Sequence, residues 1–187
     1  MATNVPFATH ASSSKSNLER DLLGAVLAGQ VAGLIMAVAM VAVFTLFLGA
    51  AWYHPVQVIG SFALGDAALP GSFFLPAFLA GLAIHQLVAT LAWSLGFGLL
   101  INKVPRTFVN VLALGLATGV ASQVFDAALF VPAIMNRFHG HNIWAENVPA
   151  AWSWLAHVVF GLGFLVFLPI RQALRRVHVR TVSERAS

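Results

Sequence analysis

The chain has 187 residues, of which 59% are hydrophobic and only 9% are charged, and its mean hydropathy is +0.86. Soluble domains carry about 25% charged residues, so this composition predicts an all-α, polytopic membrane protein with one membrane domain. The formal net charge of +4 does not indicate nucleic-acid binding, because the basic residues lie at the ends of apolar segments. There is no cysteine, which excludes disulfides and thiolate-bound metals or clusters.

The N-terminal third of the chain predicts a tail and a first span. Residues 1–21 are polar and serine-rich, and predict a cytoplasmic tail with a helix cap at Ser16 or Asn17. The apolar segment 22–52 is long enough to cross a bilayer. Within it Gly29 and Gly33 form a GxxxG pattern, which permits close helix packing.

The segment 54–75 is too apolar for an ordinary loop and too rich in glycine and proline for a span. It predicts a short interfacial or re-entrant helix on the outer side, beginning near Pro55. Its single charge, Asp66, is expected to be solvated.

Span two is predicted over 76–101. Its polar residues Gln86, Thr90 and Ser94 recur every four residues and therefore share one helix face, with His85 beside it. The short turn at 102–106 makes spans two and three antiparallel neighbours.

Span three is predicted over 107–134, with Pro132 at its outer end. Gly115 and Gly119 form a second GxxxG pattern, and Thr118, Ser122 and Asp126 again recur every four residues. A polar loop at 135–148 leads to span four at 149–168. The membrane domain as a whole covers 22–170, and residues 171–187 form a basic cytoplasmic tail suited to an anionic lipid surface.

The distribution of basic residues predicts the orientation. Of the ten lysines and arginines, only Arg137 lies on the side of the 53–75 and 135–148 loops. The other nine lie with the two termini and the 102–106 turn: Lys15, Arg20, Lys103, Arg106, Arg171, Arg175, Arg176, Arg180 and Arg185. The positive-inside rule therefore predicts a multi-pass protein of the bacterial inner membrane with both termini in the cytoplasm.

Three ionisable residues are predicted to lie at one depth. His85, Asp126 and His157 each lie eight or nine residues from the outer end of a span, or about 12–14 Å at the helical rise. Ionisable groups inside a membrane are unfavourable without partners and indicate a functional site. A second polar cluster is expected at the outer mouth: His54, His139, His141 and Glu146.

The residue types leave three interpretations of this layer open. Asp126 can hydrogen-bond a histidine and lock the bundle. The histidines and Asp126 can bind a divalent transition metal, or His85 and His157 can bind one b-type haem, for which Gly81 and Gly161 would leave room. The layer can also relay protons or ions.

The segments HPVQVIGSFALGDAAL, IHQLVATLAWSLGFGLL and WLAHVVFGLGF resemble those of small four-helix bacterial inner-membrane proteins of the YagU type. The resemblance covers about residues 22–168. It implies a four-helix fold and an inner-membrane location, and it implies no catalytic residues.

The sequence contains no HExxH, GxSxG or phosphate-loop motif, so no catalytic residue is predicted. The expected role is that of a non-catalytic accessory subunit, with the lipid bilayer and other membrane subunits as partners. A GxxxG pattern on each of spans one and three is more than a small bundle requires, which favours that role. The alternatives are a metal- or haem-binding electron-transfer subunit and a small ion transporter.

Overall fold

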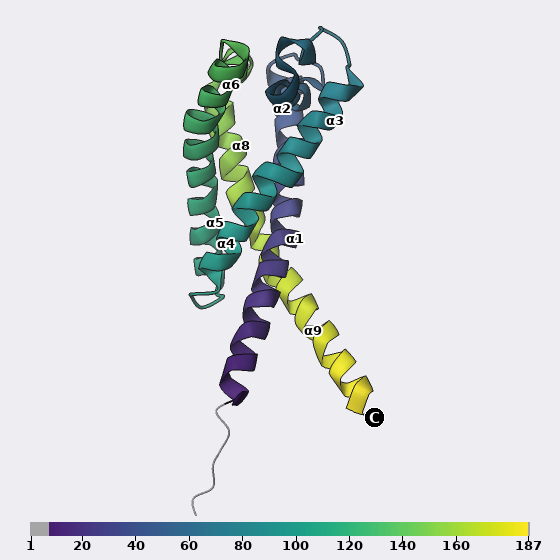
Figure 1. Ribbon diagram of the computed structural model, residues 1–187, viewed down its shortest axis with the longest axis vertical. Helices are drawn as coiled ribbons and strands as arrows, with labels where there is room; N and C mark the ends of the chain where they lie inside the picture. The colour runs from purple at the N-terminus through teal and green to yellow at the C-terminus, as the bar shows by residue number, and fades with distance from the viewer. Residues whose placement is uncertain (1–7, 187) are drawn as a thin grey trace, which may run out of the picture.

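The computed structural model describes the backbone of residues 8–186, and the side chains of 17–176 apart from Ala89. This part of the chain is helical and contains no strand. Four helical segments are long and apolar enough to cross a membrane: Asn17–Phe47, Leu75–Ile101, Phe108–His139 and Ala150–Arg176. The predicted all-α, four-span membrane fold is therefore confirmed (Figure 1).

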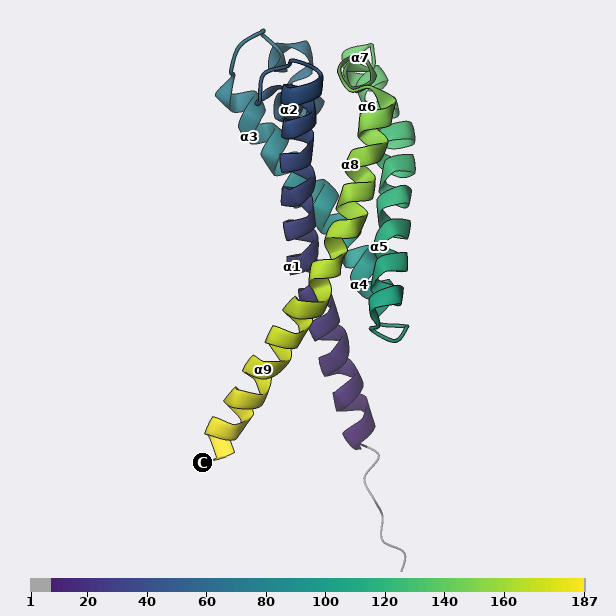
Figure 2. The same ribbon diagram turned by 180° about the vertical axis from the view of Figure 1, so that it is seen from behind.

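Two helices, α1 (Ala8–Phe47) and α8 (Ala150–Gly163), pack against each other and form the middle of the bundle. Helix α1 also packs against α4 (Leu91–Ile101). Helix α8 lies between α1 and α5 (Phe108–Ser122), as Figure 2 shows from behind. Helices α4 and α5 meet near the turn that joins them and diverge from there (Figure 1). We call the end of the bundle with this turn the tail end, and the opposite end the loop end.

Both GxxxG patterns are used for packing within the chain. A Cβ on Gly29 would lie 1.6 Å from Ser94 Oγ, and one on Gly33 would lie 2.4 Å from Thr90 Cγ2. A Cβ on Gly119 would lie 2.3 Å from the carbonyl oxygen of His157. A Cβ on Gly115 would lie 2.5 Å from the carbonyl oxygen of Gly161. The expectation that these glycines exceed the needs of one bundle was wrong, because each faces a neighbouring helix of the same chain.

Helix α2 (His54–Leu64) and a 3-10 turn, η1 (Gly65–Ala68), cover the loop end. Helix α2 lies against α3 (Leu75–Ala83), with so little space that a Cβ on Gly60 would be 2.1 Å from the carbonyl oxygen of Ala77. The buried side chain of Gln57 donates to the carbonyl of Ala68 at 2.8 Å and accepts from the backbone N–H of Phe74 at 2.9 Å. These bonds fold the glycine-rich segment back onto α2, which is the predicted short helix outside the spans.

Several helix boundaries differ from the prediction. Helix α1 begins at Ala8, so Asn17 lies within the helix, and the predicted cap at Ser16 concerns a side chain outside the described residues. Helix α1 also ends at Phe47, five residues before Trp52. Span three does not end at Pro132 but continues through α6 (Val131–His139). After η4 (Phe164–Val166), α9 (Phe167–Ala186) continues span four into the basic tail, where the side chains of Arg180 and Arg185 are not described.

A buried ion network holds the tail end together. Asp21 of α1 has no exposed surface and pairs with Arg106 of the α4–α5 turn and with Arg171 of α9. Arg106 also donates to the carbonyl and side chain of Asn102. Asp21 was expected in the polar N-terminal tail, and the two arginines were counted only as basic flanks. Instead the three residues join span one, the turn between spans two and three, and span four, because a buried carboxylate requires paired cations.

Candidate binding cavity between spans two and three

The predicted polar layer lies in two stretches of widened helix. Residues Ile84–Thr90 (η2) in span two and Gln123–Phe130 (η3) in span three both have π-helical geometry. His85 lies in the first stretch and Asp126 in the second. Short π-helical stretches are rare and frequently occur at functional sites, because the extra residue per turn redirects side chains.

Local chemistry accounts for both π-helical stretches. Pro132 has no N–H, and in a regular α-helix its ring would clash with the carbonyl four residues earlier. The preceding turn is wider than an α-helical turn and ends in a hydrogen bond from Val131 N–H to Asp126 O, which relieves that clash. In span two, the carbonyl of Gln86 accepts from Gln30 Nε2 at 3.0 Å and from the Thr90 hydroxyl at 2.6 Å. The two side chains thus take the place of the backbone N–H that would donate to the Gln86 carbonyl in a regular α-helix.

The predicted shared face of Gln86, Thr90 and Ser94 is confirmed, because all three face α1. Gln30 donates to Thr90 Oγ1 at 2.9 Å, and Gln86 donates to Gln30 Oε1 at 3.1 Å. Ser94 packs on Gly29. Gln30 is therefore a structural partner that the sequence interpretation missed. In the sequence, the feature that indicates this role is that Gln30 is a lone amide side chain inside an apolar span.

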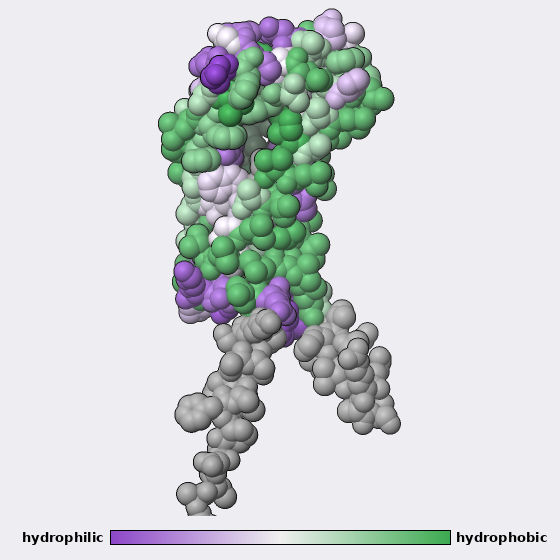
Figure 3. Space-filling model, viewed as in Figure 1, coloured by the Kyte–Doolittle hydropathy of each residue, from purple (hydrophilic) through white to green (hydrophobic). Residues whose placement is uncertain are grey.

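A cavity of about 750 Å³ lies between the diverging halves of spans two and three. Helices α1 and α8 form its back wall with Met36, Met40, Ala156 and Phe160, and α2 closes the loop end with Val56 and Ile59. Val88, Phe125 and Phe130 flank it at the lipid-facing surface, where each is largely exposed. Figure 3 shows this face hollowed between α3 and α6, with mostly apolar residues around the hollow.

His85, Asp126 and His157 all line this cavity, as their common depth predicted. Both histidines are nearly buried, at 8% and 7% exposure. The three spans thus bring the predicted layer to the lining of one cavity.

The side-chain bonds of the layer differ from the expected histidine–carboxylate pair. Asp126 Oδ2 accepts from Trp93 Nε1 at 2.7 Å, so its partner is an indole of span two. His157 Nδ1 donates to the carbonyl oxygen of Ser153 at 2.8 Å, and His85 Nδ1 lies 3.0 Å from Gln86 Oε1. One feature of the sequence indicates such a role for Trp93: its indole lies deep in a span, where the N–H requires a partner.

The described side chains give no support to the predicted metal or haem site. Within residues 17–176 no three His, Cys, Asp or Glu side chains are grouped closely enough to hold a metal ion. The space expected beside the histidines is also occupied. A Cβ on Gly81 would lie 2.0 Å from the carbonyl of Val56, and one on Gly161 would lie 2.6 Å from that of Gly115. These glycines admit helix backbones, so they do not themselves provide the room for a macrocycle that was expected beside the histidines.

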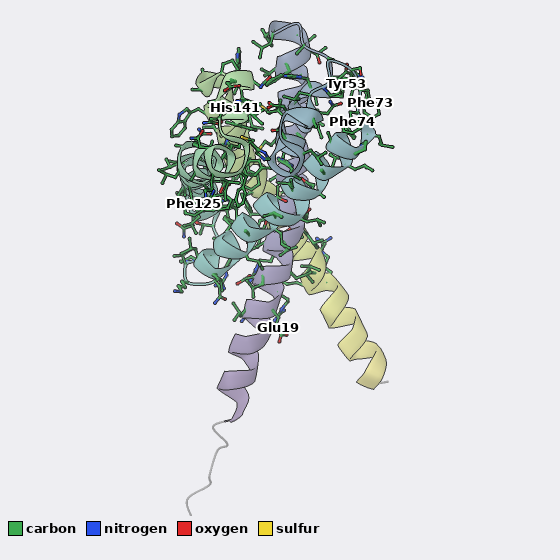
Figure 4. All side chains as sticks on the ribbon, turned by 45° about the horizontal axis from the view of Figure 1, so that its top comes forward. Glu19, Tyr53, Phe73, Phe74, Phe125 and His141 are labelled. Carbon is green, nitrogen blue, oxygen red and sulfur yellow. The ribbon has the colours of Figure 1, made fainter. Side chains whose placement is uncertain are left out.

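The expected outer-mouth cluster divides into separate contacts. His141 bridges two elements of the loop end, with Nδ1 2.8 Å from Glu146 Oε1 and Nε2 3.1 Å from Asp66 Oδ2. Asp66, expected to be only solvated, is therefore paired. Hydrogen bonds to Glu146 and then to Asp66 raise the pKa of His141 above its ordinary value. Figure 4 shows His141 on the opposite side of the loop end from Tyr53 and Phe73.

The other two histidines of that cluster have different environments. His139 Nε2 donates to the carbonyl of Phe62 at 3.1 Å, which joins α6 to α2. His54 packs on Phe44 with ring centroids 5.9 Å apart, and burial lowers its pKa against a hydrogen bond with Asn147. Glu146 also lies on a short helix, α7 (Ile143–Asn147), capped by Asn142. The cluster is thus three local contacts rather than one site.

Comparison of the chain with family models, with curated proteins and with solved structures found no match.

Proposed function

We propose that this integral membrane protein binds a lipophilic small molecule, which enters from the bilayer between spans two and three. The observation that supports this proposal is the cavity of about 750 Å³, apolar over most of its wall, with three ionisable side chains in its lining. Sites for small molecules are commonly of about 300–1,000 Å³, mostly apolar, with a few polar groups that set orientation.

The apolar surroundings favour entry from lipid rather than from water. Val88, Phe125 and Phe130 line the cavity and are exposed at the surface that the bilayer would cover. Helix α2 closes the loop end above it, with Gln57 holding the following segment in position. A hydrocarbon chain crossing this opening exchanges lipid contacts for similar protein contacts, so the polar end of the ligand determines selectivity.

The proposed orientation follows the basic residues. Nine of the ten lie toward the tail end, which the positive-inside rule assigns to the cytoplasm. The cavity would then open in the outer half of a bacterial inner membrane. The resemblance to small inner-membrane proteins of the YagU type supports the same location.

A second candidate function is that of an accessory subunit. It is favoured by α1 and α9, which diverge beyond the α4–α5 turn and extend from the bundle as two separate helices (Figures 1 and 2). Gentle purification would then recover a complex much larger than the 19.9 kDa chain with its detergent. Recovery only as a monomer in several mild detergents would contradict a subunit role.

Filling the cavity tests the proposed binding function. Gly96 lines the cavity, and a Cβ on it would meet nothing within 4 Å, so Gly96→Leu adds bulk there without a clash. Leu100→Phe adds bulk at an exposed position of the same helix outside the cavity. Native mass spectrometry of protein from gentle detergent should show a lipophilic adduct on the wild type and on Leu100→Phe, and none on Gly96→Leu. Equal adducts on all three proteins would contradict the proposal.

A further inference from the structure

We infer that the cavity selects a lipophile whose polar end donates a hydrogen bond from a hydroxyl group. This inference deepens the proposed binding function and rests on it. It depends on which atoms of the polar wall are already engaged within the protein.

The hydrogen bond of His157 fixes which ring nitrogen faces the ligand. A carbonyl oxygen only accepts, so Nδ1, 2.8 Å from Ser153 O, must carry the proton. In the neutral ring, which an apolar cavity favours, Nε2 is then an acceptor.

The same argument applies to His85 through the orientation of Gln86. Gln86 Nε2 donates to the carbonyl of Gln30 at 3.2 Å and to its side-chain oxygen at 3.1 Å. The amide oxygen of Gln86 therefore faces His85 and accepts from Nδ1 at 3.0 Å. Nε2 of His85 is the second acceptor of the wall.

As the ionised carboxylate, the form that the hydrogen bond from Trp93 stabilises, Asp126 supplies the third acceptor. Its Oδ2 accepts from Trp93, and Oδ1 remains. Every buried polar side-chain atom in the described part of the chain has a partner. The imidazole Nε2 atoms, which bond to no described residue, are therefore open to the cavity.

Three donors that line the cavity are engaged within the protein, whereas the indole of Trp144, which lines it from α7 at the loop end, has no side-chain bond of this kind. The Trp93 indole donates to Asp126, the Thr90 hydroxyl to Gln86 O, and the Ser122 hydroxyl to Gly119 O at 2.9 Å. Away from Trp144, where His85, Asp126 and His157 meet the cavity, the wall thus offers acceptors while the donors Trp93, Thr90 and Ser122 are engaged. A carbonyl or ether oxygen would meet only acceptors there, whereas a hydroxyl hydrogen would be bonded. Unpaired polar groups in an apolar site weaken binding strongly.

Two pairs of probes test this inference, each differing only by methylation of the hydroxyl. Para-decylphenol is matched with para-decylanisole, and tetradecanol with its methyl ether. Each pair is added as an equimolar mixture to the detergent-purified full chain, and the bound ratio is measured by native mass spectrometry. We expect at least one hydroxyl member to exceed its ether by about tenfold or more. Selection in the first pair alone indicates a phenolic ligand, and selection in both indicates a general alcohol.

The variant Asp126→Asn replaces one hydrogen-bond acceptor of the cavity wall with a donor. In Asp126→Asn the amide oxygen can keep the Trp93 bond while the amide nitrogen presents a donor to the cavity. The hydroxyl-to-ether ratio should fall toward one. Thr118→Val is the control, since Thr118 bonds to Leu114 O in the same span and does not line the cavity. It should retain the wild-type ratio.

The possible failures are distinguishable. Equal binding of hydroxyl and ether in both pairs, suppressed by Gly96→Leu, would overturn the inference about the polar end and leave the binding function standing. Binding of none of the four probes would overturn both. Retention of the wild-type ratio in Asp126→Asn would overturn the assignment of the wall as an acceptor surface.

Discussion

The indole of Trp93 donates its hydrogen bond to Asp126 across the gap between spans two and three, at 2.7 Å. It links the two diverging spans directly, beside the edge-on contact of the Trp93 and Phe125 rings. Trp93 and Asp126 are only partly buried, and both line the cavity. The bond therefore fixes the separation of the spans and the position of the carboxylate together.

Removing this donor should destabilise the protein. Trp93→Phe leaves the Asp126 carboxylate without its partner, which typically costs about 1–3 kcal/mol. We expect a lower midpoint in reversible denaturation of the detergent-solubilised protein. Trp154→Phe, at an exposed position of α8, is the control and should change the midpoint little. In Trp93→Phe/Asp126→Asn the effects should be less than additive, because the two residues share one bond. Full additivity would show that the bond contributes nothing to stability.

Close packing of spans three and four should make Gly119 intolerant of any side chain. A Cβ there would lie 2.3 Å from the His157 carbonyl, so Gly119→Ala must push α5 away from α8. The expected loss is about 1–3 kcal/mol, typical of overpacking. Gly96→Ala has open space and should be neutral or slightly stabilising, since alanine favours helix. Comparison of the two denaturation midpoints tests this assignment, and equal midpoints would contradict it.

The ion network at the tail end should respond unequally to loss of its two cations. Asp21 is fully buried, Arg171 is 8% exposed, and the Arg106 side chain is 27% exposed. Asp21→Ala leaves Arg171 buried without a counter-charge, a change that typically costs about 3–5 kcal/mol. Arg171→Met should cost more than Arg106→Met, because water can solvate the exposed side of the Arg106 pair. Denaturation of the three variants at one ionic strength measures the order, and the reverse order for the arginines would be inconsistent with it.

The loop end should lose stability as the solution becomes more alkaline. Hydrogen bonds to Glu146 and Asp66 raise the pKa of His141, so the folded protein holds this proton more tightly than the unfolded chain. The resulting stabilisation is present below the ordinary imidazole pKa of about 6.5 and is lost as pH rises through the raised value. This contribution should be absent in His141→Gln, whereas the opposite contribution of His54, whose pKa is lowered, should remain. A histidine NMR titration would give the sign directly, and a lowered pKa at His141 would contradict its hydrogen bonds to Glu146 and Asp66.

The orientation predicts where reporters will function. A reporter fused after Ser187, and another inserted between Lys103 and Arg106, should both report the cytoplasm in a bacterial host. One inserted between Gly140 and Asn142 should report the opposite side. These positions test the positive-inside argument independently of any ligand. A cytoplasmic signal from the third reporter would contradict the four-span topology or its orientation. The lack of a cytoplasmic signal from either of the first two reporters would do the same.

Periodicity and depth were sufficient to predict much of this arrangement. The four spans, the α1-facing row of Gln86, Thr90 and Ser94, and the placement of His85, Asp126 and His157 on one cavity all follow from residue spacing. Such arguments need only a rise per residue and a regular face. They succeeded because the spans are long and strongly apolar.

What the spacing could not predict arises where helix geometry or pairing departs from the regular pattern. The π-helical stretch at Gln123–Phe130 changes the direction of Asp126, which then bonds to Trp93 rather than to a histidine. Pro132 was interpreted as an end, although a widened turn let the helix continue. Asp21 was placed in a tail because no local pattern distinguishes a solvated carboxylate from one enclosed by arginines distant in sequence.

The central claim is that a lipophile with a hydroxyl end occupies the cavity between spans two and three. The most direct test is photolabelling of the bilayer-reconstituted protein with an alkylphenol that carries a diazirine on its chain, followed by peptide mass spectrometry. The account predicts labels at Val88, Phe125 and Phe130, suppressed by excess unlabelled alkylphenol. Labels distributed equally over the other lipid-facing positions, such as Val38 and Val109, and unaffected by that competitor would contradict it.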